Sequence, residues 1–314
     1  WELPYILFKT YSISVHPFGC VLGNSFLDPE KKSVQTVRNA RMEIVFLGTS
    51  GSVPTRGSGN VSMVIRIGAN SLLVDVSGNP IQSLLKVGID PLSLDALVLT
   101  HAHTDHLYAL PSLFHALWMM HRRRALTLFA NPHTEQKAKD LLRVFGLDER
   151  PGLFPHRFIS LPAEPMCIPF PWNADEGPVP DRVGAELLFF PVHHSVPTHG
   201  FLLKALGKRI LYTSDTAPLH SWVADTVDVL IHEASGEEKE EESLNPAGHS
   251  SGRQAGEAAI QLHARELFLC HIPAEPSKAK TIEGEARRKI RNMASSTRLR
   301  IPLPYRWYSL FTPS

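Results

Sequence analysis

Three histidines and one aspartate fall within six consecutive residues, His101-Ala-His103-Thr-Asp105-His106, immediately after the apolar stretch 95–100. The short apolar run predicts a buried strand, so the four side chains emerge together at a strand end. Imidazole and carboxylate groups suit zinc, manganese or iron, and a site built from them requires no cysteine. His101 and His103 alternate onto one side of the chain, whereas Asp105 and His106 point to a neighbouring position where a helix begins. One short loop can therefore supply ligands to two metal ions.

The composition is that of a soluble globular protein. Hydrophobic residues make up 43% of the 314 residues and charged residues 20%, which excludes a disordered or low-complexity chain. Lys and Arg number 32 against 31 Asp and Glu, so no overall charge draws the chain to nucleic acid or to an acidic membrane. The odd count of 3 cysteines indicates a reducing compartment, which we expect to be the cytoplasm. The longest apolar run, 107–120, is too short to cross a bilayer.

Apolar periodicity predicts strands and helices along the rest of the chain. We expect strands at 43–47, 61–67, 71–76, 95–100, 126–130, 185–192, 201–205, 209–213, 228–232, 266–271 and 298–301. We expect helices at 80–87, 107–121, 134–145, 251–263 and 278–292. The strand–helix series occurs twice and no linker separates two cores. This pattern predicts an α/β protein with two sheets packed face to face and helices outside, a four-layer αββα sandwich.

Two segments fall outside the regular pattern. Residues 1–41 mix aromatic and turn residues without a period and lack the parts of a signal peptide. We interpret them as an N-terminal extension and 42–314 as the functional domain; an ordinary strand pair packed on the domain is an equal alternative. Residues 150–183 hold many prolines, so we expect an irregular segment with at most short edge strands. Long irregular loops are usually functional, which favours a place at the active-site rim or in a dimer contact over a surface insertion.

The motifs together resemble those of the metallo-β-lactamase superfamily, and within it the RNase Z-like branch. His-x-His-x-Asp-His after an apolar strand is similar to the superfamily signature. Other segments resemble motifs of the branch, in the family's own order between about residues 43 and 275: 46–55, 99–106, 110–113, 194–201, 211–216, 228–234, 249–251 and 269–271. Their order and spacing make the resemblance specific. It implies the metallo-β-lactamase fold and a metal-dependent hydrolase.

The resemblance implies a dinuclear centre with seven ligands. They are His101, His103 and His194 for one ion, Asp105, His106 and His271 for the second, and Asp215 as the bridge. Asp105 also counts among the catalytic residues. His249 would protonate the leaving oxygen, and Glu233 would orient His249. The expected cofactor is two divalent ions, Zn first with Mn or Fe as alternatives, and their shared hydroxide would be the nucleophile.

The residues by themselves leave three alternatives open. His193 adjoins His194, and only the match to His-Ser-x-x-x-x-Gly favours His194 as the ligand. His249 could instead begin a helix with Ser250 as its cap. Glu233 could be a surface carboxylate with no part in the centre.

The spacing of the later motifs bears on the substrate. His194 and Asp215 lie 21 positions apart, which leaves room for two strands and a tight turn. Typical RNase Z enzymes carry a long arm in this interval that grips tRNA, whereas the short gap is similar to that of small-molecule cyclic-phosphate phosphodiesterases. We therefore expect a phosphodiesterase acting on small or cyclic phosphodiesters. The alternatives are an RNA 3′-end endonuclease of the RNase Z type, a lactone or β-lactam hydrolase, and a metal-binding scaffold without turnover.

Four polar segments bear on the partners. The loop 48–60 lacks the ending of a P-loop, and we place it beside the metal ions, where its hydroxyls could meet a substrate phosphate. The basic clusters 121–124 and 287–291 are interpreted as solvated helix faces rather than nucleic-acid contacts. The acidic run 237–242 predicts an exposed loop. The expected partner is a small phosphodiester, with RNA less favoured, no membrane, and a homodimer as an option.

Overall fold

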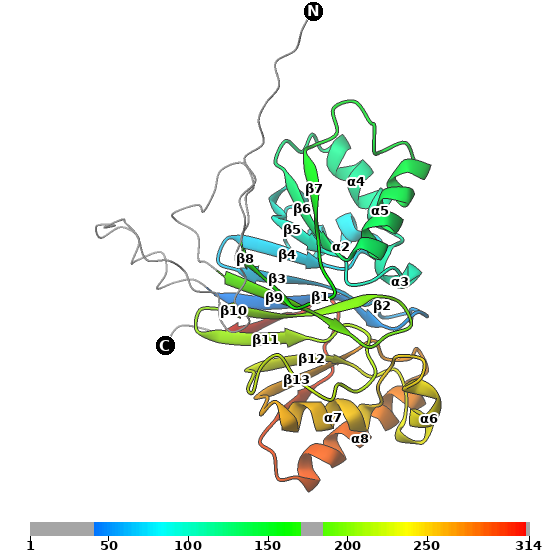
Figure 1. Cartoon of the computed structure of the whole chain (residues 1–314), viewed down its shortest axis with the longest axis vertical. Coiled ribbons are helices and arrows are strands. Elements are labelled where there is room, and N and C mark those ends of the chain that lie inside the picture. The colour runs from blue at the N-terminus through cyan, green and yellow to red at the C-terminus, as the bar shows by residue number, and fades with distance from the viewer. Residues whose placement is uncertain (1–40, 171–184, 312–314) are drawn as a thin grey trace, which may run out of the picture.

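The computed structural model describes residues 41–170 and 185–311, which form two β-sheets packed face to face (Figure 1). The first sheet has the strand order β15-β1-β3-β4-β5-β6-β7, and β2 pairs with the carboxyl end of β1. Its strands are β1 (Met42–Ser50), β2 (Gly59–Asn60), β3 (Ser62–Ile67), β4 (Asn70–Val74), β5 (Ala96–Val98), β6 (Leu126–Ala130), β7 (His156–Ser160) and β15 (Trp307–Phe311).

The second sheet has the order β14-β13-β12-β11-β10-β9-β8. Its strands are β8 (Met166–Phe170), β9 (Ala185–Val192), β10 (Thr198–Ala205), β11 (Lys208–Tyr212), β12 (Val229–Glu233), β13 (Glu266–Cys270) and β14 (Arg298–Arg300).

Helices cover the outer face of each sheet (Figure 1). The first sheet carries α2 (Pro80–Lys86), α4 (Leu110–Met119) and α5 (Pro132–Val144), and the second carries α7 (Gly252–Gln261) and α8 (Pro276–Asn292). An apolar cluster joins the two sheets, with the rings of Phe46 and Phe268 centred 5.6 Å apart. Full burial of such a side chain stabilises the fold by about 1.5–3 kcal/mol. One further apolar cluster lies between each sheet and the helices that cover it. The predicted αββα sandwich is confirmed.

Both sheets contain a run of parallel strands. β4, β5 and β6 pair in parallel in the first sheet, and β11, β12 and β13 do so in the second. Ligand sites of α/β sheets form beyond the carboxyl ends of such strands, where loop side chains converge. Asp75, His101, Asp215 and His271 each follow one of these ends. The topology therefore directs polar residues from both sheets to one edge of the sandwich.

The helix predicted at 107–121 is divided in the structure. A one-turn helix, α3 (Thr104–Leu107), begins inside the histidine motif, and α4 begins only at Leu110. Pro111 in the first turn of α4 has no N–H to donate to the Leu107 carbonyl, so one continuous helix cannot form. The backbone N–H of Ala109 donates instead to Val76 O at 3.2 Å. The single turn of α3 holds Asp105 beside the end of the strand.

The prediction that 298–301 is the last strand is wrong. β15 follows it, returns to the first sheet and pairs antiparallel with β1, where Ile44 is opposite Tyr308. The tyrosine ring packs edge-on against Phe268 of the second sheet at 5.2 Å. β15 is held by its pairing with β1, at the other end of the described chain, and local periodicity cannot reveal such a distant partner.

The described part of the proline-rich segment contains β7 and β8, and each lies at the edge of its sheet. Pro169 of β8 has no N–H for a ladder bond, which an edge strand tolerates. The expectation of short edge strands is therefore confirmed. Residues 171–183 and 1–40 lie outside the described residues, so the predicted extension, the domain boundary and the role of the segment stay predictions. Within the ranges described, no helix is long and apolar enough to cross a membrane.

The acidic run 237–242 is not the exposed loop that we predict. It forms two short helices, η2 (Glu238–Glu240) and α6 (Glu241–Leu244), against α7 and α8. Glu241 pairs with Arg253 at 2.6 Å, and Glu240 with Lys278 at 2.7 Å. These ion pairs offset the mutual repulsion of the carboxylates, so the run adopts helical turns beside basic helices.

Candidate metal centre

The structure brings the seven predicted ligand residues together at the carboxyl ends of the strands. His101, His103 and His194 form one group, and Asp105, His106 and His271 form another; within each, the donor atoms lie within 4.8 Å of one another. Asp215 forms a group of the same kind with His101 and His106. Geometry alone does not assign ligands, and their individual roles remain predictions.

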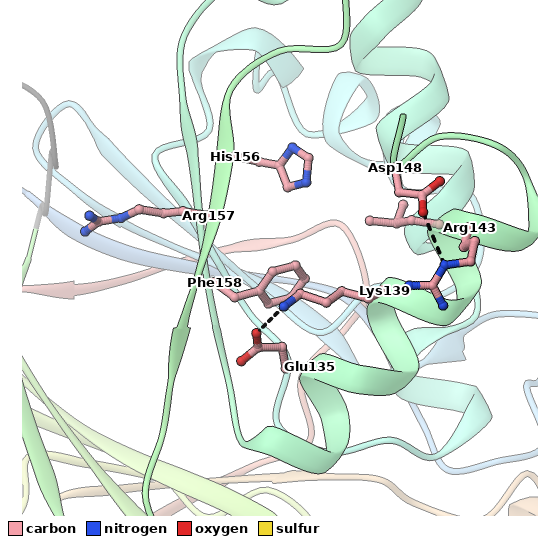
Figure 2. Close-up of a pocket in the computed structure, with 8 residues that line it drawn as sticks. Glu135, Lys139, Arg143, Asp148, His156, Arg157 and Phe158 are labelled. Atoms are coloured by element: carbon pink, nitrogen blue, oxygen red, sulfur yellow. Dashed lines mark hydrogen bonds and ion pairs between the residues drawn. The ribbon is translucent and has the colours of Figure 1, made fainter. Parts of the chain in front are cut away.

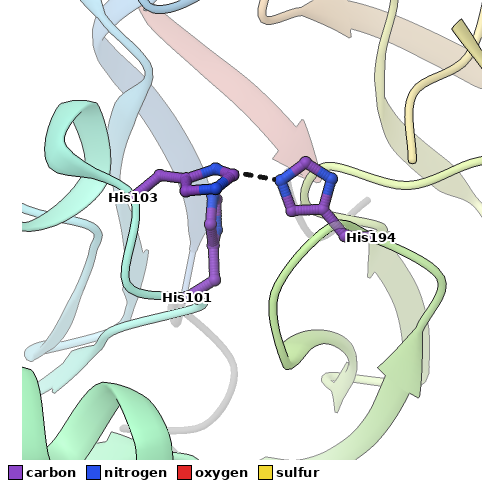
Figure 3. A group of neighbouring side chains, drawn as sticks. All are labelled: His101, His103 and His194. Atoms are coloured by element: carbon purple, nitrogen blue, oxygen red, sulfur yellow. Dashed lines mark hydrogen bonds between the residues drawn. The ribbon is translucent and has the colours of Figure 1, made fainter. Parts of the chain in front are cut away.

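The first group joins the two sheets (Figure 3). His101 and His103 follow β5, whereas His194 follows β9 of the second sheet. His194 Nε2 lies 3.0 Å from His103 Nδ1, and His101 Nε2 lies 3.8 Å from Asp215 Oδ2. Two nitrogens at about 2.0–2.1 Å from a tetrahedral zinc ion would be roughly 3.3 Å apart. The imidazole spacing therefore fits two ligands of one ion.

The second group surrounds the other side of Asp215. His271 Nε2 lies 3.0 Å from Asp215 Oδ2 and 3.5 Å from Asp105 Oδ2. His106 Nε2 lies 3.5 Å from the same Asp215 oxygen. One carboxylate therefore lies close to imidazoles of both groups, as a bridging ligand requires.

His194, rather than its neighbour His193, belongs to these groups. The backbone carbonyl of His193 accepts a hydrogen bond from Ala217 at 2.8 Å, while His194 Nδ1 donates to Gly248 O at 2.8 Å. Gly248 has φ +83°, and a Cβ there would lie 2.5 Å from His194 Cα. Only glycine fits this approach, so Gly248 fixes which way the His194 ring faces.

Asp75 is a site residue that the sequence analysis missed. It is buried, and it accepts hydrogen bonds from His106 Nδ1 at 2.8 Å and from Thr100 Oγ1 at 2.9 Å. Because the Thr100 hydroxyl donates to Asp75, its oxygen can accept from His101 Nδ1 at 3.0 Å. The Nδ1 atoms of both rings are thereby used in these bonds, so the Nε2 atoms are the ones available to a metal ion once His106 has lost its second proton. The available signal was a single acid inside the apolar stretch 72–76.

Several buried polar atoms of the centre have no hydrogen-bond partner. Among the described residues these atoms include His101 Nε2, His106 Nε2, His271 Nε2 and Asp215 Oδ1. Buried polar atoms without a partner are costly, and a cluster of them that faces a common point calls for a ligand. Imidazole nitrogens and a carboxylate oxygen are the donors that Zn, Mn and Fe accept, so the residues present fit divalent metal ions.

The electrostatics of the centre favour cations. Burial raises the pKa of Asp215, but the imidazoles of His271 and His106 outweigh it and hold that pKa well below its ordinary value. Burial lowers the pKa of His106, but the carboxylates of Asp215 and Asp75 raise it well above its ordinary value. Burial lowers the pKa of His101, which keeps its ring neutral. A metal ion would replace the proton on His106, and binding would therefore release protons.

Glu233 and His249 form a pair beside the centre. Glu233 ends β12 and is fully buried, so the alternative of a surface carboxylate is wrong. His249 Nδ1 donates to Glu233 Oε1 at 2.9 Å, and the His249 side chain is 21% exposed. The cap of α7 is Ser251 rather than Ser250, and the helix begins at Gly252. Burial lowers the pKa of His249, but the Glu233 carboxylate outweighs it and raises that pKa above its ordinary value.

The loop 51–58 lies against the second group. Gly51 donates its N–H to Ile272 O at 3.1 Å, and a Cβ on Gly51 would lie 3.1 Å from the His271 ring. Asn60 Nδ2 holds the loop through Gly51 O at 2.7 Å. Gly51 is therefore the part of this loop that lies next to His271.

The basic clusters are engaged within the protein. Arg122 is buried, and it donates to the carbonyls of Leu92 and Leu94 rather than facing solvent as we predict. Burial lowers the pKa of Arg122 to about 10. On α8, Arg287 pairs with Glu283 at 2.6 Å. Arg122 therefore departs from the predicted solvated face, whereas Arg287 is 52% exposed and agrees with it.

Figure 2 shows a cavity of about 380 Å³ between α5 and β7, remote in sequence from the metal-binding groups. Its cations are neutralised locally: Lys139 pairs with Glu135 at 2.6 Å, and Arg143 with Asp148 at 3.4 Å. None of the predicted ligands lines it. The cavity is therefore separate from the predicted metal centre.

Residues 73–272 match the family described as the beta-lactamase superfamily domain. Ribonuclease Z of Methanothermobacter thermautotrophicus is 24% identical over 282 residues, covering 78% of this chain and 91% of that protein. The metallo-beta-lactamase fold protein YhfI from Bacillus subtilis aligns with a TM-score of 0.67 and 19% identity over 86% of this chain and 99% of its own. Human short-form tRNase Z aligns with a TM-score of 0.64 and 19% identity over 86% of this chain and 100% of its own.

The chain belongs to the beta-lactamase superfamily. Within it the chain lies in the RNase Z-like branch and has the metallo-β-lactamase fold. It is a metal-dependent hydrolase, and its histidine and aspartate groups are able to bind metal ions.

Proposed function

We propose that this hydrolase is a phosphodiesterase that holds two Zn²⁺ ions and cleaves small or cyclic phosphodiesters. The observation that carries the proposal is the set of buried donor atoms that face one another without partners among the described residues. Their distribution over two groups with Asp215 between them supports two ions rather than one. When bound, two such cations polarise phosphoryl oxygens and activate water.

In this proposal one ion is held by His101, His103 and His194, and the other by Asp105, His106 and His271, with Asp215 shared. Asp75 holds His106 directly and His101 through Thr100, and Gly248 holds His194. Each of these bonds uses Nδ1, so Nε2 of each ring is the candidate ligand atom. A ring that is fixed before the ion arrives loses little entropy on binding, so this support raises metal affinity.

His249 is the proposed proton donor to the leaving oxygen. Its Nδ1 proton is held by Glu233, which leaves Nε2 for the substrate, and its exposed fraction allows a substrate to reach it. Glu233 orients the ring and stabilises its protonated form. His249 lies near His194 and Asp215, with donor atoms within 4.8 Å, so the proton is close to where the ions would hold the phosphate.

A tight hairpin supports a small substrate. β10 and β11 are joined only by Leu206 and Gly207, with φ of +51° and +70°. Between His194 and Asp215, a stretch that the structure describes in full, no arm extends from the chain. Arg122 and Arg287, one from each basic cluster, are engaged within the protein. A long polyanion such as tRNA relies on cationic contacts along its backbone, whereas a small phosphodiester needs only the ions and nearby hydroxyls.

An RNA 3′-end endonuclease is the second candidate. It is favoured by the Methanothermobacter thermautotrophicus relative, which carries the name Ribonuclease Z and aligns over 78% of this chain. A substrate panel on the Zn²⁺-loaded protein separates the two: pre-tRNA, cyclic nucleotides, cyclic ribose phosphates and a lactone, with bound metal measured in the same preparation. We expect two ions per chain and the highest kcat/KM on a small phosphodiester. Preferential cleavage of pre-tRNA would reverse the order of the two candidates, and turnover of the lactone alone would exclude both.

A further inference from the structure

Ser235, two residues beyond Glu233, touches both the proton-donor pair and the second metal-binding group. Its Oγ lies 2.6 Å from Glu233 Oε2, 2.8 Å from His271 Nδ1 and 3.2 Å from His249 Nδ1. No motif in the sequence marks this residue.

The hydrogen bonds around Glu233 decide where the Ser235 proton points. Glu233 Oε1 accepts from the Thr216 N–H at 2.9 Å and from His249 Nδ1 at 2.9 Å. Oε2 accepts from the Ser235 N–H at 3.1 Å and from its hydroxyl. An ionised carboxylate only accepts, and the bond to Oε2 is the shortest that Ser235 Oγ makes, so the hydroxyl proton goes to Glu233.

A hydroxyl that donates to Glu233 can only accept from His271. His271 must then carry its proton on Nδ1, which leaves a lone pair on Nε2. His271 Nε2 is one of the buried atoms that have no hydrogen-bond partner among the described residues, and it lies 3.0 Å from Asp215 Oδ2. The direction of a single hydroxyl proton therefore determines which nitrogen of His271 faces the second group.

Thr100 makes the same arrangement on the first sheet. Its hydroxyl donates to Asp75 and can accept from His101 Nδ1 at 3.0 Å. The two systems differ at the carboxylate: Asp75 also receives a proton from the predicted ligand His106, whereas Glu233 receives one from His249.

We propose that Ser235 is a positioning residue that orients His271 toward the second metal ion and connects that ion to the Glu233–His249 pair. The proposal rests on the dinuclear function above. Ser235 forms no bond to substrate or metal; it acts through His271. The Ser235 hydroxyl is the hydrogen-bond partner of His271 Nδ1 among the described residues, so it is the contact that fixes which way the ring faces. The His249 ring stacks on the His271 ring at 5.4 Å, so a rotated His271 would also disturb the proton donor.

The test is a Zn²⁺ titration of the metal-free protein against a chromophoric chelator, for the wild type, Ser235→Ala and Ser235→Thr. We expect two tight sites in the wild type and in Ser235→Thr, which keeps the hydroxyl. In Ser235→Ala we expect one of the two sites to weaken by about 10–100-fold. Turnover of Ser235→Ala should recover as Zn²⁺ is raised, because the weakened site refills. Ser235→Gly, which removes the hydroxyl without adding a metal ligand, replaces the alanine variant if that one does not fold.

Ser250→Ala is the matched control. It removes a buried serine hydroxyl from the same region, one that donates to Thr216 O at 2.7 Å and touches no predicted ligand ring. Both of its sites should stay tight. Two equally tight sites in Ser235→Ala would overturn the role of Ser235 while leaving the proposed function intact. A wild type that binds no Zn²⁺ would instead overturn the proposed function itself.

Discussion

Two buried carboxylates, one from each sheet, organise the centre by the same hydrogen-bond pattern and to different ends. Asp75 follows β4 of the first sheet, and the two rings that it orients, His106 directly and His101 through Thr100, are both fully buried. No solvent reaches these rings. The first sheet thus contributes a closed arrangement that fixes the orientation of two predicted ligands.

Glu233 ends β12 of the second sheet and orients one buried ring, His271 through Ser235, and one partly exposed ring, His249. The second sheet therefore joins ligand support to a group that a substrate can reach. In the proposed function, one hydrogen-bond pattern fixes predicted ligands where both of its rings are buried, and supports proton transfer where one of them meets solvent. Variants of the two carboxylates and their partners test this difference.

The largest effect is expected from Asp75→Ala. It leaves the Thr100 hydroxyl and the Nδ1 proton of His106 buried without their acceptor, and it removes negative charge from the centre. We expect loss of bound metal, loss of turnover, and a free energy of unfolding lower by about 3–5 kcal/mol, as when one partner of a buried ion pair is deleted. Elemental analysis and urea unfolding measure the two effects.

Asp95→Ala separates metal loss from instability. Asp95 is also buried, and it accepts from the Ser71 N–H at 2.7 Å and pairs with Arg124, outside the metal-binding groups. This variant should unfold more easily but keep two ions. If Asp75→Ala also keeps two ions, Asp75 does not support the ligands.

The next largest effect is expected from His249→Ala. A positioned proton donor contributes about 10²–10⁴-fold to turnover, so we expect a loss of that size with two ions still bound. His220→Ala, which removes an exposed imidazole outside the predicted centre, is the control and should change neither quantity. Loss of one ion from His249→Ala would mean that His249 is a ligand, as its closeness to His194 and Asp215 allows.

The predicted ligands of the first sheet were easier to predict from the sequence than the residues that orient them. His101, His103, Asp105 and His106 are contiguous, so their placement at one strand end follows from a single motif. Asp75 could have been suspected because a lone acid inside an apolar strand must find a buried partner. The two-layer packing of sheets also followed from periodicity, since each strand and helix had one clear apolar face or run.

The residues that orient the rings of the second sheet could not be predicted from the sequence, for a physical reason. Ser235 carries no local signal, because a serine after a strand is ordinary and its importance depends on His271, far along the chain. The pairing of β15 with β1 is non-local in the same way. The helical form of the acidic run depends on basic residues of α7 and α8, such as Arg253. Sequence motifs locate ligands, whereas the groups that orient them appear only once distant segments are packed.

Thr100→Val tests whether the Thr100 hydroxyl supports metal binding without affecting the proton donor, unlike the Ser235 hydroxyl of the second sheet. Valine keeps the shape of threonine but cannot accept from His101 Nδ1 or donate to Asp75. We expect Zn²⁺ affinity at one site to fall by about 10–100-fold, and Thr100→Ser to restore it. The pH dependence of turnover at saturating Zn²⁺ should stay as in the wild type, because the His249 pair is untouched. A changed pH profile would contradict the separation of the two arrangements.

The smallest expected effect is a change of pH dependence in Glu233→Gln. A proton donor works only when protonated, so turnover should fall as the pH rises through the pKa of His249. The Glu233 carboxylate raises that pKa by stabilising the protonated ring, and it outweighs burial, which lowers it. Glutamine can still accept from His249 Nδ1 but carries no charge, so the pKa falls and the alkaline limb moves to lower pH. On that limb turnover follows the protonated fraction of His249, so turnover at a fixed alkaline pH falls when the pKa falls.

The measurement is kcat/KM against pH for the Zn²⁺-saturated wild type and Glu233→Gln, with Thr100→Val as the reference whose limb stays in place. Saturating both sites removes any contribution from weaker metal binding, which would otherwise lower turnover at acid pH because protons compete for the ligands. A displacement of the acid limb alone would therefore report ligands, whereas a displacement of the alkaline limb reports the proton donor. If the alkaline limb of Glu233→Gln coincides with that of the wild type, Glu233 does not control the His249 proton, and the contrast between the two carboxylates reduces to the different exposure of the rings that they orient.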